Sequence, residues 1–276
     1  MIKNFAGNTF NIYHVMTYLI PGVMVLSFIY WGAAGIAARP LPNPFAKSPD
    51  KYVYVMNAIF VLLSGYLVGH FVQIFSSVFE TRLNRKMGWL SEKFLRDDDS
   101  YYTPAFKANI KKYAREVFDL PAEPRKADER ALRKRRQEIF NLCYTLIQQE
   151  NLGAQTYIFS SMYSLFRGML GAVWVGLAVG ALILLKHLLL LLPWWPAPTV
   201  DPIFEFRGLH IPVALVVLVV LGLLIRPLEY RFSLFRSHFV NSVYRSFYVW
   251  RKRLNFNRNK LEFTSVAQPS DQMGEL

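Results

Sequence analysis

Polar side chains interrupt two apolar stretches of this chain, and they are its clearest candidates for chemistry. His70, Gln73 and Ser77 are spaced i, i+3 and i+7, so they share one face of a helix. His14 lies at a comparable depth in the preceding apolar stretch. Polar groups in lipid must face partners or water, so this set predicts either a hydrogen-bond cluster between helices or a cavity that serves as a pore, proton path or substrate site.

Signatures of common enzymes and metal sites are missing. The chain has no G-x-x-x-x-G-K-[ST], G-x-S-x-G or H-E-x-x-H motif, and its five histidines lack metal-ligand spacing. The single cysteine, Cys143, excludes an intramolecular disulfide and a Cys-rich zinc site. The acidic run at 97–99 lacks the alternating ligand spacing of a calcium loop. We therefore expect no catalytic residue, metal or cofactor.

Four stretches of the 276-residue chain are almost free of charged residues, and they must position the polar set. A helix of about 20 mostly apolar residues crosses the roughly 30 Å hydrocarbon layer of a bilayer. Pro21 and Gly22 predict a kink in the first stretch, and Arg226 with Pro227 marks the exit of the fourth. The predicted transmembrane helices cover residues 14–38, 54–77, 169–192 and 211–225.

The distribution of basic residues predicts the orientation. All but five of the 32 Lys and Arg residues precede the first span, separate the second from the third, or follow the fourth. Because basic residues are retained in the cytoplasm, both termini are expected there. The remaining segments are a cytoplasmic leader at 1–13, periplasmic loops at 39–53 and 193–210, and a disordered tail at 264–276.

The predicted fold is an all-α membrane protein with a helical cytoplasmic domain at 78–168, inserted between spans two and three. Thr103 and Pro104 predict a helix start in this domain. A later helix carries apolar residues at i, i+3, i+4, i+7 and i+8, so one face of it should be buried. We expect that helix to continue, bent near Gly153, into the third span, where it would transmit motion. Its apolar face consists of Ile139, Leu142, Cys143, Leu146 and Ile147.

A basic amphipathic helix is expected after the fourth span, at 226–263, and a second dense basic run precedes it at 125–136. The C-terminal helix could lie among anionic headgroups of the inner leaflet or pack against the central domain. The 125–136 run would ordinarily form a solvated face or a face between subunits. Alternatively, it could bind an anionic lipid, a nucleotide or, less favoured, nucleic acid. The candidate anion-binding residues are Arg125, Arg130, Arg133, Lys134, Arg136, Arg226, Arg231 and Arg236.

Small residues recur every fourth position in two spans, which is typical of close helix contacts in membranes. Such stripes can pack within one subunit or between the subunits of a homo-oligomer. The stripes are Gly65 and Gly69 on the second span, and Gly168, Ala172, Gly176 and Gly180 on the third.

Two short motifs, YLIPG at 18–22 and GYLVGHFVQ at 65–73, together with the four-span layout, resemble uncharacterised bacterial inner-membrane proteins. Some proteins of that kind belong to anti-phage defence operons, as membrane partners or effectors of a cytoplasmic sensor. The resemblance implies an oligomeric membrane sensor, scaffold or pore-forming effector with a cytoplasmic protein partner. A small-solute channel or transporter and a lipid-modifying membrane enzyme remain as alternatives.

Overall fold

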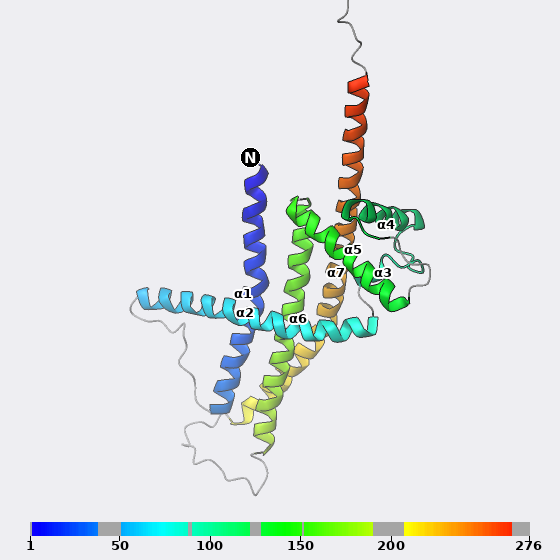
Figure 1. Ribbon diagram of the computed structural model, residues 1–276. Helices are drawn as coiled ribbons and strands as arrows, with labels where there is room; N and C mark the ends of the chain where they lie inside the picture. The colour runs from blue at the N-terminus through cyan, green and yellow to red at the C-terminus, as the bar shows by residue number, and fades with distance from the viewer. Residues whose placement is uncertain are drawn as a thin grey trace, which may run out of the picture. The chain divides into compact units, whose positions relative to one another are not determined.

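Seven helices make up the secondary structure of this computed structural model (Figure 1), which describes residues 2–37, 51–87, 90–121, 128–150, 152–189 and 207–266. These ranges contain no strand, so the prediction of an all-α chain is confirmed. The predicted loops at 39–53 and 193–210 and the predicted tail lie largely outside the described residues, and Arg125 lies outside them entirely.

Four of the helices are long and apolar enough to cross a membrane: α1 (Ile2–Ala37), α2 (Lys51–Met87), α6 (Ala154–Leu189) and α7 (Arg207–Val266). They also expose large apolar side chains. Phe60 and Phe71 of α2, for example, are each 71% exposed. Extended exposed apolar surface is rare on soluble monomers but is what lipid tails cover. The four helices therefore have the make-up of a multi-pass membrane protein.

The first and last long helices both continue through a proline. The predicted leader at 1–13 is the first part of α1, which is helical from Ile2 onward, and Pro21 lies inside α1 without ending it. At the other end of the chain, α7 continues through Pro227, so the fourth span and the predicted amphipathic helix are parts of one helix. Proline is tolerated inside long apolar helices because neighbouring groups compensate for the one backbone hydrogen bond it removes.

The predicted continuation of a domain helix into the third span is wrong. The helix α5 (Glu129–Gln149) ends where the Leu152 amide donates to the Ile147 carbonyl at 2.9 Å. Gly153 then has φ 103°, a conformation that suits glycine, and α6 begins at the next residue. Gly153 therefore marks a break between two helices.

The chain divides into two compact units. We call the first, Met1–Met87 with Ile158–Arg236, the bundle, and the second, Gly88–Tyr157 with Ser237–Leu276, the helical domain. In the bundle, small apolar clusters join the helices, such as Val25, Val72 and Ala172 from α1, α2 and α6.

The helical domain adds two short helices, α3 (Leu90–Lys93) and α4 (Pro104–Phe118). The predicted start of α4 is confirmed, because the Thr103 hydroxyl caps it by accepting from the Phe106 amide at 3.3 Å. Asp128 caps α5 in the same way, through the Ala131 amide at 2.6 Å. The predicted buried face of α5 is also confirmed, since Ile139, Cys143 and Ile147 are among the most buried residues of this unit.

The end of α7 supplies much of the helical domain's core. Val243, Tyr244 and Phe247 are all fully buried, against residues of α4 and α5 such as Ile110 and Cys143. The Tyr244 hydroxyl donates to the Ser91 carbonyl at 2.7 Å. The sequence leaves two locations open for the basic C-terminal helix, a headgroup layer and the central domain. Residues 240–247 pack in the central domain.

Burial makes Cys143 a reporter of domain opening. The side chain is fully buried, and burial raises the pKa of its thiol far above the ordinary value. At pH 8 we expect maleimide to modify it on the order of 1,000 times more slowly than in denaturant, because a folded domain opens for roughly 10⁻³ of the time or less. Mass spectrometry of the intact chain measures this rate. The control is Thr145→Cys in a Cys143→Ser background, since Thr145 is exposed on the same helix and should react without protection.

Candidate functional site

Glycines allow α1 and α2 to meet backbone to backbone where the two helices cross (Figure 1). A methyl group on Gly22 would overlap the carbonyl of Gly65, and one on Gly69 would overlap the carbonyl of Tyr18. The predicted glycine pair of α2 therefore packs inside the same chain.

The small-residue stripe of α6 is also filled by neighbouring helices of the bundle. Gly168 leaves room for the amide of Gln73, while Ala172 belongs to the apolar cluster with α1 and α2. Gly176 faces side chains of α1 and α7, and so does Gly180. Of the two roles left open by the sequence, the structure assigns both stripes to contacts within one subunit.

Gln73 links three helices of the bundle through its amide. Its Nε2 donates to the Thr17 carbonyl of α1 at 3.1 Å and to the Ser164 carbonyl of α6 at 2.8 Å. Its Oε1 accepts from Nε of Arg167 at 3.2 Å. The side chain is buried, and lipid could offer its amide no hydrogen-bond partner. These three bonds use both N–H groups and the oxygen of that amide.

Two other members of the predicted polar set, His70 and Ser77, have contacts of their own away from Gln73. His70 is half-buried beside two tyrosines, with its ring stacked 3.9 Å from Tyr18 and edge-on 4.8 Å from Tyr66. Ser77 donates to the Ile74 carbonyl of its own helix at 2.6 Å. His14 belongs to α1, but its side chain lies outside the described part of the structure.

Glu80 and Arg167 form an ion pair that we did not predict from the sequence. Glu80 lies about two helical turns after Gln73 on α2. Arg167 Nη1 is 2.8 Å from Oε2 of Glu80, and the Tyr163 hydroxyl donates to the second carboxylate oxygen. Only 10% of the Glu80 side chain and 22% of the Arg167 side chain are exposed. The Arg167 guanidinium also lies 5.5 Å from the centre of the Tyr163 ring, within the range of a cation–π contact.

A second guanidinium lies in the electrostatic range of this pair. Arg236 is only 6% exposed and interacts electrostatically with Glu80 and Tyr163. One turn earlier on α7, Phe232 stacks on the Tyr163 ring at 5.2 Å, which brings this face of α7 against α6. We call Gln73, Glu80, Tyr163, Arg167 and Arg236 the bundle cluster.

The sequence did contain a signal for this cluster. Glu80 is the only acidic residue between Asp50 and Glu92, and Arg167 is the only basic residue between Arg136 and Lys186. An isolated charge at the edge of an apolar run has few partners to choose from, and burying it alone is costly. Two such charges of opposite sign therefore predict a pair.

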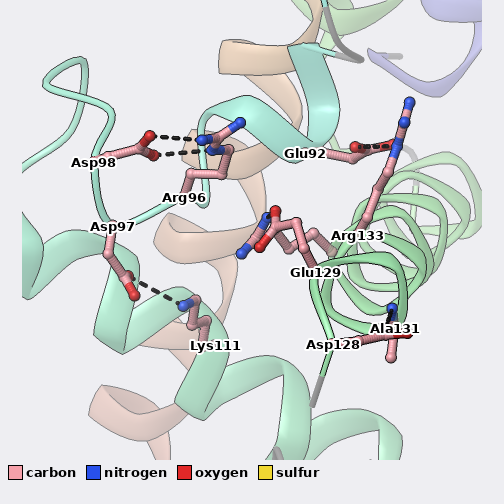
Figure 2. A network of polar contacts seen from close by, with 10 residues as sticks. Glu92, Arg96, Asp97, Asp98, Lys111, Asp128, Glu129, Ala131 and Arg133 are labelled. Atoms are coloured by element: carbon pink, nitrogen blue, oxygen red, sulfur yellow. Dashed lines mark hydrogen bonds and ion pairs between the residues drawn. The ribbon is translucent and has the colours of Figure 1, made fainter. Parts of the chain in front are cut away.

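The basic run on α5 is largely engaged inside the helical domain (Figure 2). Arg133 pairs with Glu92 at 2.7 Å and Arg136 with Glu129 at 2.9 Å. Arg135 pairs with Glu138 at 2.9 Å. Of the predicted anion-binding residues, Arg136 and Arg236 are buried, so neither belongs to an exposed basic face. Those that remain exposed are Arg130, Arg133 and Lys134 on α5 and Arg226 and Arg231 on α7.

The acidic run at 97–99 lies in the turns between α3 and α4. Asp98 pairs with Arg96 at 2.6 Å and Asp97 with Lys111 at 3.3 Å (Figure 2). The hydrogen bond from Arg96 lowers the pKa of the Asp98 carboxyl. Buried Lys107 donates to the carbonyls of Arg96 and Asp99, which holds the turn.

The described residues contain no group of His, Cys, Asp and Glu able to hold a metal ion, either in the bundle cluster or in the helical domain. No protein-family model, curated protein or solved structure matches this chain. Function is therefore inferred from the two units and from the bundle cluster.

Replacing Gln73 with leucine tests the link between three helices. We expect the bundle to lose about 2 kcal/mol of unfolding free energy, because hydrogen bonds between membrane helices contribute roughly 0.6 kcal/mol each and Arg167 also loses an acceptor. Titration of the purified protein with SDS in mixed micelles measures the loss. Ser77→Ala is the matched control and should change little, since Ser77 bonds only to its own helix. Equal losses in the two variants would contradict the assigned role of Gln73.

Proposed function

We propose that this chain is a membrane sensor or scaffold in which the helical domain and the membrane helices are coupled through α7. The observation that carries the proposal is that α7 is one unbroken helix. Near its start lies an uncharged apolar run at 211–225, and its residues Val243, Tyr244 and Phe247 lie in the core of the helical domain. In this proposal a partner or ligand that changes the packing of the domain acts on the bundle through that helix.

Packing at the domain end of α7 supports mechanical coupling. Tyr244 and Phe247 are fully buried in an aromatic-rich core, in which Tyr244 lies edge-on to Phe140 with ring centres 5.8 Å apart. Side chains in such close-packed cores cannot shift singly, so a rearrangement of α4 or α5 would displace α7 as well.

The proposed setting is the bacterial inner membrane, with both termini and the helical domain in the cytoplasm. The excess of basic residues at 78–168 and after residue 225 supports this orientation. A cytoplasmic protein partner, as in the anti-phage systems that the sequence resembles, is part of the proposal. Arg130 and Lys134 are exposed and make no ion pair within the described residues, so they would favour an acidic partner surface.

Self-association is also proposed, but the glycine stripes no longer support it because the chain's own helices fill them. The exposed apolar side of α2, with Phe60 and Phe71, is a surface on which a second copy could pack. The mass of the detergent-solubilised protein, measured by light scattering, tests this point directly. A monomer at all concentrations would rule out self-association and leave the coupling proposal intact.

Coupling is tested with a cysteine reporter in the bundle. In a Cys143→Ser background, Ala172→Cys places a thiol at a fully buried bundle position, and its maleimide labelling rate reports bundle opening. Phe247→Ala, which loosens the helical domain, should accelerate this labelling several-fold. Three glycines inserted between Arg236 and Ser237 should abolish the acceleration, because they interrupt α7 at the boundary of the two units.

Two controls separate coupling from general loss of structure. Val249→Ala changes an exposed position of α7 and should leave labelling at residue 172 unchanged. The glycine insertion without Phe247→Ala should itself leave the domain folded, as judged by slow labelling of native Cys143 in a parallel sample. If Phe247→Ala loosens the domain without affecting the bundle, the proposed coupling is wrong.

A further inference from the structure

Arg236 is a buried cation in the bundle without a counter-charge of its own. It is 6% exposed, and within the described part of the chain it makes no hydrogen bond or ion pair. The Glu80 carboxylate interacts electrostatically with Arg236, but its hydrogen bonds from this cluster come from Tyr163 and Arg167. The bundle cluster thus combines two guanidinium groups with one carboxylate.

The described helices of the bundle offer no second buried acid to balance this charge. No Asp or Glu occurs in α1 or α6, and Glu80 is the only one in α2. On α7, Glu229 is the only acidic residue before Arg236, and it is exposed two turns away. Because a buried cation is strongly disfavoured without an anion, the cluster carries a net positive charge that favours binding an anion from outside the chain.

We propose that Arg236 and Arg167 bind a phosphate group. A guanidinium presents paired N–H donors that match the oxygens of phosphate, and this geometry favours arginine over lysine at such sites. The cluster lies where the apolar runs end, since Glu80 follows the candidate span Lys51–Val78 by two residues. Phospholipid phosphates occupy that depth of a bilayer. The partly exposed side chain of Arg167 gives the anion access.

This site involves only residues of the bundle, so a failure of the proposed coupling through α7 would not disprove it, and the reverse also holds. Glu80 would hold Arg167 in place when the phosphate is absent and share it when the phosphate is bound. The phosphate can belong to a lipid headgroup or to a free phosphate ion, because both present the same oxygens to the two guanidinium groups.

Thermal unfolding of the full chain in neutral detergent tests the site in two arms, monitored by tryptophan fluorescence. One arm adds dihexanoyl phosphatidylglycerol and the other inorganic phosphate, each compared with sodium chloride at equal ionic strength. We expect the Tm of the wild-type protein to rise in at least one arm beyond the chloride control. A response to the lipid alone identifies the headgroup as the source, and a response to inorganic phosphate identifies free phosphate.

Arg236→Gln should weaken the response at least tenfold in apparent affinity. Without phosphate, the same variant should have a Tm equal to or higher than that of the wild type, because it removes an uncompensated buried charge. Arg236→Lys keeps the charge but not the paired donors, and should bind several-fold more weakly. The control Arg231→Gln alters an exposed arginine of the same helix and should respond like the wild type.

Three results would overturn the site. The first is a wild-type Tm that responds to neither phosphate source beyond chloride. The second is an Arg236→Gln variant that responds like the wild type. The third is a large fall in Tm for Arg236→Gln without phosphate, reversed in Arg236→Lys, which would show that Glu80 alone already compensates Arg236.

Discussion

Glu80→Gln is expected to destabilise the bundle more than any other single change to its polar residues. The substitution keeps the shape of the side chain but removes the one carboxylate of the described residues that pairs with Arg167 and interacts electrostatically with Arg236. Removing one partner of a buried ion pair costs about 3–5 kcal/mol, because the remaining charge is buried without compensation. SDS titration in mixed micelles should show a loss of this size in the free energy of unfolding.

The control for this variant is Glu229→Gln. Glu229 is the other acidic residue of the described bundle helices, but it is exposed on α7. Exposed charges contribute little, so this change should stay within about 0.5 kcal/mol of the wild type. Similar losses in the two variants would show that the Glu80 pair does not stabilise the bundle.

A double variant shows whether the loss comes from the pair itself. Arg167→Met combined with Glu80→Gln removes both charges and should be more stable than Glu80→Gln alone, because only Arg236 then remains uncompensated. If the two substitutions simply add, the charges do not interact.

Gly69→Ala is expected to disrupt the crossing of α1 and α2. The added methyl group would overlap the Tyr18 carbonyl, which is backbone and cannot turn aside as a side chain can. Overpacking of this kind typically costs 1–3 kcal/mol, and about 3 kcal/mol is expected here because a whole helix must move. Gly22→Ala, which meets the Gly65 carbonyl, should show a similar loss in the same SDS titration.

Two further glycines calibrate this prediction. A methyl group at Gly222 meets nothing within 4 Å, so Gly222→Ala should be neutral or slightly stabilising. At Gly176 the neighbours are side chains of Phe28 and Leu221, which can adjust, so an intermediate loss is expected. A loss for Gly222→Ala as large as that for Gly69→Ala would mean that backbone contact is not what these glycines provide.

The same variants address how the two glycine stripes are used. Packing within the chain predicts that Gly69→Ala lowers the stability of a monomer and of any oligomer alike. Packing between copies would instead change the mass in detergent without changing the unfolding of the monomer. The two measurements together therefore distinguish the arrangement seen here from an intersubunit role.

Local patterns in the sequence predicted the helices well. Uninterrupted apolar runs identified the four long helices, because a segment without charges can be buried in lipid and every backbone group in a helix is paired. Thr103 with Pro104 identified the start of α4, and the spacing of Ile139, Cys143 and Ile147 identified the buried face of α5. Each of these depends only on neighbours within a few turns.

One predicted junction differs from the observed one. Glycine at 153 indicated only a bend, yet α5 ends before it and α6 begins after it, whereas α7 is continuous through Pro227, which was predicted to mark only the exit from the hydrocarbon. A single proline removes one hydrogen bond and can be tolerated in a long helix, whereas a positive φ cannot be part of an α-helix. The residue types marked the positions, but the backbone conformation decided the outcome.

By itself, the sequence determined the helical class, the number of long apolar helices and the segregation of basic residues, because these follow from composition and local spacing. Only the tertiary structure decided the other polar contacts: that Gln73 joins Thr17 and Ser164, and that the Tyr163 hydroxyl bonds to Glu80. It also decided that Tyr244 and Phe247 belong to a domain core. The physical reason is that a buried charge or ring is stabilised by whatever the fold brings beside it, and those partners lie 56 to 153 residues away along the chain.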